Sequence, residues 1–159
     1  MEGVRPRQLT APAGRATAVV ATATDWDGFP RLWGKLLDEV REHAQGRNVM
    51  VYLDDLPHVE VGVLPRGEFT PGGRVTRSEL PSGPAVGMTH RGPYERLADT
   101  HEAVLRHIAE HGLEKTGVRW EIYGPWQEVP EVEVFWLVHP DPRGLLEGQA
   151  RDLVDLGPE

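Results

Sequence analysis

Hydrophobic positions recur along this chain in two patterns, and the two patterns alternate. Apolar side chains in residues 29–44 and again in residues 93–111 are spaced three and four apart, which predicts two amphipathic helices. Shorter runs of alternating or β-branched residues predict strands. We expect strands over residues 16–24, 48–54, 58–64, 84–91, 118–124 and 132–139, with shorter ones at 4–9 and 74–80.

Proline, aspartate and glycine mark the expected ends of the helices. Pro30 fits the first turn of the first helix, where a missing backbone N–H costs little. Asp25 or Asp27 is placed to cap the same end. Gly46 and Gly112 follow the last apolar position of each helix, as glycines at helix C-termini commonly do.

The order strand, helix, strand, strand occurs twice, which indicates an internal repeat. Repeat one covers about residues 15–80 and repeat two about residues 83–139. Neither repeat can bury both its helix and its sheet by itself. We therefore predict an α+β fold in which two β-α-β-β repeats, related by a pseudo-two-fold axis, form one antiparallel sheet with two helices on one face. Residues 1–14 are expected to form a flexible arm and residues 140–159 a tail.

The most aromatic segment, residues 120–126, carries the strongest candidate for a functional group. Read as a strand, it points Trp120 to one face of the sheet and Glu121 and Tyr123 to the other. A carboxylate among aromatic rings suits a cationic or flat aromatic ligand. The simpler alternative is an exposed glutamate, or one in a salt bridge with Arg119.

Aligning the two repeats gives Glu121 a counterpart. A shift of 71 residues places Met50 on Glu121 and Tyr52 on Tyr123, so one charge breaks the symmetry of the scaffold. The groove between the two helices is the natural ligand site, because clefts between modules commonly hold ligands. We expect the two tyrosines to face each other across it, with ordinary sheet packing as the alternative. The ligand-binding residues predicted in this way are Glu121, Tyr123, Tyr52, Trp33, Met50 and Tyr94.

Other side chains are candidates for the walls of this groove. Trp33 lies on the inner face of the first helix, where the second helix has Ala98, so it forms either a bulky wall or part of the core. Trp126 either covers the groove or lies on the surface. His101 lies on the inner stripe of the second helix and is expected to be packed and hydrogen-bonded, whereas His90 is expected to orient the turn into that helix.

Composition excludes several classes of protein. The 159 residues include no cysteine, which rules out disulfides and thiolate metal sites. A net charge of −8 makes nucleic-acid binding a poor fit, and no apolar run is long enough to span a membrane. His107 and His111 have the spacing of a metal pair, but they lie on the polar side of their helix. We expect a cytoplasmic protein with no metal and no cofactor.

Three short motifs stand out in the second repeat: the His-Arg-Gly-Pro-Tyr turn at residues 90–94, the His-Gly-Leu helix end at residues 111–113, and Trp-Glu-Ile-Tyr at residues 120–123. Their sequence and spacing resemble those of the GyrI-like small-molecule-binding domains, which also form the effector-binding halves of AraC-type and BmrR-type regulators. The resemblance covers about residues 15–139. It implies one duplicated α+β domain with a cleft along the pseudo-two-fold, in which Glu121 contacts a ligand that is often cationic and lipophilic.

The resemblance leaves turnover of the ligand open. Some stand-alone proteins of this kind are self-resistance hydrolases of strained, cyclopropane-containing toxins. In such an enzyme Glu121 would transfer protons and Tyr123 would hold the ligand or the attacking water. We see no helix-turn-helix region, so we expect a stand-alone domain that binds small hydrophobic, cationic or aromatic molecules. A protein partner such as an inhibited topoisomerase is a further alternative, supported only by the acidic charge.

Overall fold

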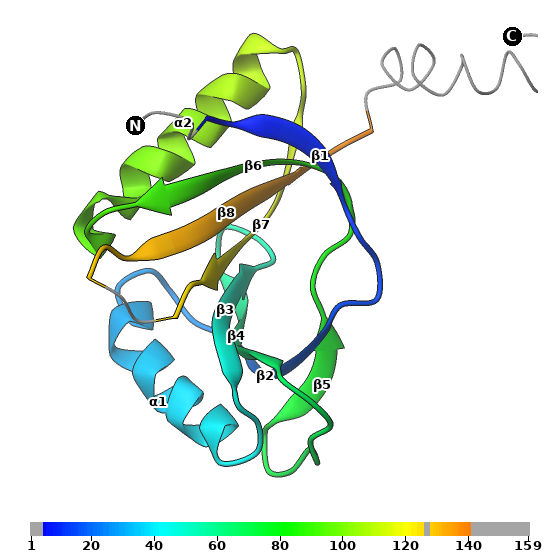
Figure 1. Ribbon diagram of the computed structural model, residues 1–159, viewed down its shortest axis with the longest axis vertical. Helices are drawn as coiled ribbons and strands as arrows, with labels where there is room; N and C mark the ends of the chain where they lie inside the picture. The colour runs from blue at the N-terminus through cyan, green and yellow to red at the C-terminus, as the bar shows by residue number, and fades with distance from the viewer. Residues whose placement is uncertain (1–4, 126–127, 141–159) are drawn as a thin grey trace, which may run out of the picture.

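The computed structural model describes residues 5–125 and 128–140, and its centre is one antiparallel sheet with two helices (Figure 1). The strands of the described residues form the order β1-β6-β8-β7-β3-β4-β2-β5. The predicted α+β class is therefore confirmed. The strands are β1 (Arg7–Ala11), β2 (Ala16–Ala23), β3 (Gly46–Tyr52), β4 (His58–Pro65), β5 (Thr76–Glu79), β6 (Gly83–Arg91), β7 (Lys115–Tyr123) and β8 (Glu131–Val138). The helices are α1 (Phe29–Arg41), the short 3-10 helix η1 (Tyr94–Arg96) and α2 (Leu97–Glu110).

The strand order makes the duplication visible. Reading outward from the middle of the sheet, β7, β8 and β6 on one side correspond to β3, β4 and β2 on the other. Helix α1 follows β2 just as α2 follows β6. The central strands β3 and β7 pair with Met50 opposite Glu121. Since these two residues are also counterparts in the repeat, the pseudo-two-fold axis passes between them.

The two edge strands are exchanged between the repeats. β1 precedes repeat one but pairs with β6 of repeat two, with Ala11 opposite Gly83. β5 lies at the end of the range predicted for repeat one, but it comes directly before β6 just as β1 comes before β2, so by element order it is the first strand of repeat two. It pairs with β2 of repeat one, with Ala16 opposite Glu79. Each repeat is therefore one strand longer than the predicted β-α-β-β unit, and the arm predicted over residues 1–14 contains the strand β1.

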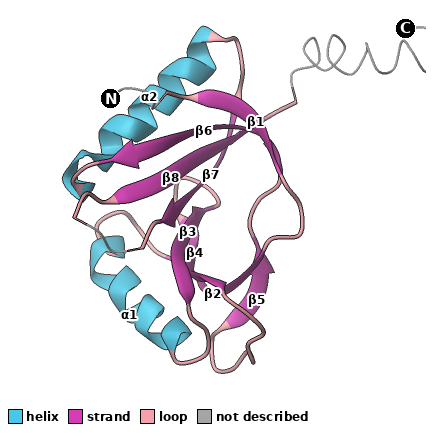
Figure 2. Ribbon diagram, viewed as in Figure 1, coloured by secondary structure: helices cyan, strands magenta, loops and turns pink. Residues whose placement is uncertain are grey.

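Both helices cover the same face of the sheet (Figure 2). Helix α1 packs on β2 and β4, and α2 packs on β6 and β8, so each helix covers its own repeat. The opposite face has a third apolar cluster, in which the rings of Trp120 and Phe135 stack with centroids 5.2 Å apart. Trp120 thus points away from Glu121, as its alternation along β7 predicts. None of the helices described here combines the length and apolarity needed to cross a membrane.

The ends of α1 differ in detail from the prediction. The helix starts after Gly28, whose backbone N–H donates to the Asp25 carboxylate at 2.6 Å. It ends at Arg41, and Gly46 belongs to β3 instead of closing the helix. A Cβ atom at position 46 would lie 1.7 Å from the carbonyl oxygen of Leu64, so this glycine permits the close approach of β3 to β4.

A second glycine in the sheet gives a test of the strand packing. Gly62 lies in β4 between β2 and β3, and a Cβ atom there would lie 1.8 Å from the carbonyl oxygen of Ala18. We expect Gly62→Ala to lower the free energy of unfolding by about 2 kcal/mol or more, because backbone must shift to admit the methyl group. Urea unfolding measures this change.

The matched control is Gly34→Ala in the middle of α1. A Cβ atom at Gly34 meets no atom within 4 Å, and alanine favours the helix. This variant should therefore gain about 0.5–1 kcal/mol. Equal stability of the two variants would contradict the strand packing described above.

Candidate functional site

Glu121 is buried at the centre of the face that the helices cover. The residue is 4% exposed, and its carboxylate accepts hydrogen bonds from two elements of the sheet and from α2. The hydroxyl of Tyr123 donates to Oε1 at 2.7 Å, and the hydroxyl of Tyr52 donates to the same oxygen at 3.2 Å. The Nε2 atom of His101 lies 2.7 Å from Oε2. We call these four residues the carboxylate cluster.

The geometry excludes both simpler interpretations of Glu121. The side chain is not exposed, and it does not pair with Arg119. Arg119 is itself buried, and its guanidinium donates to the Asp55 carboxylate at 2.8 Å. The same guanidinium lies over the rings of Trp26, Tyr52 and Trp136, at 4.9–5.5 Å from their centroids. Arg119 therefore closes one side of the site while its charge is balanced by Asp55.

Trp136 of β8 fixes the tautomer of His101. The indole Nε1–H of Trp136 lies 2.9 Å from Nδ1 of His101. An indole nitrogen can only donate, so Nδ1 must accept and the imidazole proton sits on Nε2. Nε2–H then donates to Glu121. The contact between His101 and Glu121 is thus a hydrogen bond from a neutral imidazole, which brings no positive charge to the carboxylate.

The two tyrosines remain donors because of where they lie. Burial, followed by the neighbouring Glu121 charge, raises the pKa of Tyr52 well above its ordinary value. The same two causes, in the same order, raise the pKa of Tyr123. Both hydroxyls therefore stay protonated throughout the physiological range. They lie within 4.0 Å of the Met50 sulfur as well, so the tyrosines surround the residue pair on the pseudo-two-fold.

An apolar cavity of about 300 Å³ adjoins the carboxylate cluster, between α1, η1 and the central strands. We call it the aromatic cavity. It is lined by Phe29, Pro30, Trp33, Asn48, Met50, Tyr52, Tyr94 and Tyr123. Tyr52 and Tyr123 form its boundary with Glu121, which lies behind their hydroxyls. Trp33 and Tyr94 are 40% and 52% exposed, so they form the rim of the cavity.

Five of the six residues predicted to bind a ligand meet at this cavity, namely Trp33, Met50, Tyr52, Tyr94 and Tyr123. Glu121 is the exception, because it lies one hydrogen bond away from the lining. The sequence prediction did not include Asn48, although it lies two positions before Met50 in β3 and so faces the same side.

His101 and Trp136 were also absent from the predicted set, and the repeat contains the signal that identifies them. The shift of 65 residues that aligns the helices, 94 minus 29, places Leu36 on His101. A shift of 75 aligns β4 with β8 and places Val61 on Trp136. Repeat one therefore has apolar residues where repeat two has His101, which contacts Glu121, and Trp136, which contacts His101. Both Leu36 and Val61 are fully buried.

His90 positions the rim of the cavity by orienting the start of α2. Its two ring nitrogens contact the Thr100 hydroxyl at 2.7 Å and the Pro93 carbonyl oxygen at 2.9 Å. Gly92 takes a φ of +129°, which a residue with a side chain rarely adopts. This turn places the Tyr94 ring 5.9 Å from that of Tyr123. Trp126, the other candidate for a cover, lies outside the described residues.

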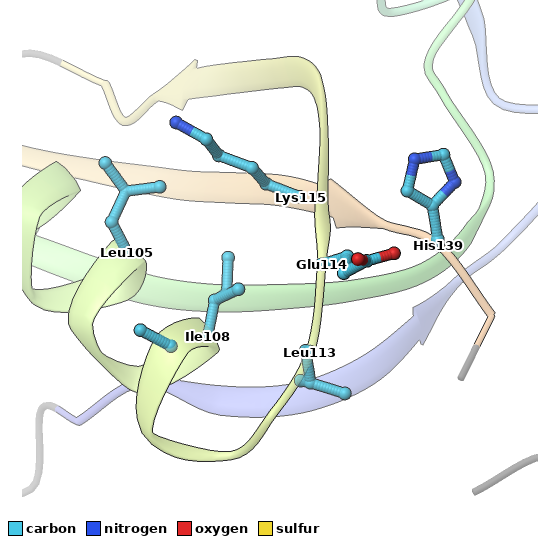
Figure 3. Close-up of a pocket in the computed structure, with 7 residues that line it drawn as sticks. Leu105, Ile108, Leu113, Glu114, Lys115 and His139 are labelled. Atoms are coloured by element: carbon cyan, nitrogen blue, oxygen red, sulfur yellow. The ribbon is translucent and has the colours of Figure 1, made fainter. Parts of the chain in front are cut away.

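A separate hollow of about 600 Å³ lies at the C-terminal end of α2 (Figure 3). Leu105 and Ile108 of the helix face Lys115 at the start of β7 there. Lys115 and Glu121 are six residues apart, or about 20 Å along a strand. This hollow is therefore distinct from the aromatic cavity. Within residues 5–125 and 128–140, no three side chains of the metal-ligating kinds converge.

The hydrogen bond from Trp136 to His101 gives a second test. We expect Trp136→Phe to lower the free energy of unfolding by about 0.5–1.5 kcal/mol, because Nδ1 of His101 loses its donor. The His101 ring is then held less firmly against the Glu121 carboxylate. Nitrogen-15 NMR of the wild-type protein at neutral pH should find Nε2 of His101 protonated and Nδ1 bare. Trp33→Phe, which changes an exposed ring at the cavity rim, serves as the control and should be nearly neutral. A proton on Nδ1 would contradict the assigned tautomer.

Comparison with known proteins identifies the fold. No protein-family model matches the chain, and no curated protein sequence matches it. The crystal structure of the EcmrR C-terminal domain matches with a TM-score of 0.68 and 17% sequence identity, over 87% of this chain and 99% of that one. SAV2435 bound to tetraphenylphosphonium matches with a TM-score of 0.57 and 11% identity, over 92% and 97%. A hydrolase encoded by lin2189 from Listeria innocua matches with a TM-score of 0.56 and 14% sequence identity, over 85% of this chain and 92% of that one.

Proposed function

We propose that this chain, which has the GyrI-like fold of the EcmrR C-terminal domain, binds a small hydrophobic cation in its aromatic cavity. Glu121 supplies the counter-charge. The observation that carries the proposal is a buried carboxylate on the pseudo-two-fold whose hydrogen-bond donors, among the residues that the structure describes, are neutral. Two phenols and one imidazole stabilise the charge without cancelling it.

The charges around Glu121 favour a cationic ligand over a neutral one. An ionised carboxylate away from water costs several kcal/mol unless it is paired or well hydrogen-bonded. Among the described residues, no lysine or arginine pairs with Glu121, and Arg119 is committed to Asp55. A cation in the adjoining cavity would complete the pair in surroundings where water screens charge poorly.

The walls of the cavity suit the same class of ligand. Phe29, Trp33, Tyr94 and Tyr123 present ring faces or edges to the space, and rings attract a cation over their faces. No acidic group is among the described residues that line the cavity. Such a lining fits a delocalised, lipophilic charge better than a compact ammonium ion, which needs several direct acceptors. Tetraphenylphosphonium, the molecule bound to SAV2435, has this character and is therefore a suitable probe.

Calorimetric titration with tetraphenylphosphonium tests the role of Glu121. We expect Glu121→Gln to weaken binding by about 1–3 kcal/mol, or about 5- to 150-fold, because the variant removes a desolvated charge and keeps the shape. Glu110→Gln, at an exposed position near the end of α2, changes the net charge equally and should bind like wild type. Equal affinities of wild type and Glu121→Gln would refute the proposed function.

Hydrolysis of strained electrophiles is the second candidate, favoured by the close contact of Glu121 with His101 and Tyr123 and by the fold that this chain shares with a hydrolase. Both carboxylate oxygens are occupied by donors, so a tyrosine hydroxyl would have to move before Glu121 could accept a proton from water. Mass spectrometry after incubation with a cyclopropane-containing alkylator separates the two functions. A water adduct that disappears in Glu121→Gln indicates catalysis, whereas recovery of unchanged compound indicates binding alone.

A further inference from the structure

A larger open hollow of about 710 Å³ adjoins the aromatic cavity and is lined by positively charged side chains. The two spaces share Asn48, Tyr94 and Tyr123 in their walls. The remaining lining of the outer space comes from the end of α1, the start of β3, the end of β4 and the turn after β7. We call it the arginine hollow, because Arg41, Arg47 and Arg66 line it and no acidic residue does among the described lining.

The charges of these arginines are only partly compensated. Arg41 donates to the neutral side-chain oxygen of Asn48 at 3.0 Å. Arg47 forms an ion pair with Glu133 at 3.1 Å, and both side chains of that pair are about two-fifths exposed. Arg66 forms no ion pair with any side chain in the described part of the protein. Two guanidinium groups therefore remain available.

This positive region contrasts with the rest of the molecule. The chain has a net charge of −8, so most of its surface repels anions. The described lining of the arginine hollow contains three arginines and no acidic residue. The nearest acids lie outside that lining, since Glu133 pairs with Arg47, and Glu42 and Glu68 line a neighbouring hollow that Arg41 and Arg66 also border. Guanidinium groups stay charged at all physiological pH values and match the geometry of carboxylate and phosphate oxygens.

Tyr123 links the two charged regions. Its hydroxyl donates to Glu121 at 2.7 Å, and its backbone carbonyl accepts from Nε of Arg47 at 2.9 Å. The negative and positive groups thus lie at opposite ends of one residue. Because Tyr94 and Tyr123 line both spaces, a molecule lying against the Tyr123 ring would reach from beside the carboxylate cluster to the arginine hollow.

We propose that the arginine hollow is a subsite for an anionic group on the same ligand, so that the preferred ligand is a zwitterionic aromatic molecule. Its cationic, apolar part occupies the aromatic cavity, and a pendant carboxylate or similar anion contacts Arg41 and Arg66. This inference rests on the proposed function and narrows the ligand class.

Two dyes that differ at one group test the subsite. Tetramethylrhodamine has an aromatic cation and a free carboxylate, whereas its methyl ester has the same cation and no anion. Fluorescence anisotropy at low salt should give the free acid about fivefold or higher affinity, the scale of a favourable half-exposed ion pair. The difference should shrink as salt is added, because salt screens exposed charges.

Amino-acid substitutions test whether the preference for the free acid over the ester depends on Arg41 and Arg66. The double variant Arg41→Gln/Arg66→Gln should bind both dyes alike, with little change for the ester. The matched control Arg31→Gln/Arg106→Gln removes two exposed positive charges that line neither space, and should keep the preference for the acid. Glu121→Gln should weaken both dyes and leave their ratio unchanged.

The outcomes separate this inference from the proposed function. Equal binding of the two dyes by wild type, tighter binding of the ester, or an unchanged preference in Arg41→Gln/Arg66→Gln overturns the anion subsite alone. Failure of wild type to bind either dye, together with failure to bind tetraphenylphosphonium, overturns the proposed function and the subsite with it.

Discussion

A carboxylate buried in a protein must find hydrogen-bond donors, and the arrangement of this molecule around Glu121 follows from that need. The donors come from β3, β7 and α2, and β8 supplies the indole that fixes the third donor. These elements belong to both repeats, so the carboxylate cluster forms only when the halves are assembled. The same side chains that satisfy Glu121 also form one wall of the aromatic cavity, which joins the stability of the core to the properties of the site.

The duplication explains why the site lies where it does and why it has one charge. Residues on a two-fold axis meet their own counterparts, so a change in one copy creates a polar pair or a charge at the centre without disturbing the rest of the scaffold. Repeat one keeps Leu36, Met50 and Val61 at three buried positions, and repeat two has His101, Glu121 and Trp136 there. The tyrosines are the shared part, since Tyr52 and Tyr123 donate to the same oxygen. An apolar half and a polar half thus meet in one cluster.

Much of this could be predicted from the sequence, because hydrophobic spacing determines which face of an element is buried. Hydrophobic spacing predicts the order of the elements, and alignment of the two repeats makes Met50 the counterpart of Glu121. The same alignment and spacing indicate five of the residues that line the aromatic cavity. Spacing does not specify partners across the fold. The bond from His101 to Glu121 depends on how α2 crosses the sheet, and the exchange of β1 and β5 depends on strands of five and four residues with little pattern of their own. Gly46 was misplaced because a glycine that permits strand contact looks, in sequence, like one that ends a helix.

The exchanged edge strands also limit how the aromatic cavity can change its width. Each half holds an edge strand that is covalently attached to the other, so the halves cannot hinge apart without unpairing a strand at both margins of the sheet. The width of the groove is therefore set mainly by the sheet, which acts as a rigid frame. The parts of the cavity wall outside the sheet are α1, the turn that holds Tyr94, and exposed rim side chains such as Trp33. If the cavity binds small molecules as proposed, the range of ligand sizes it accepts would depend on these residues, because the sheet beneath them is held in place.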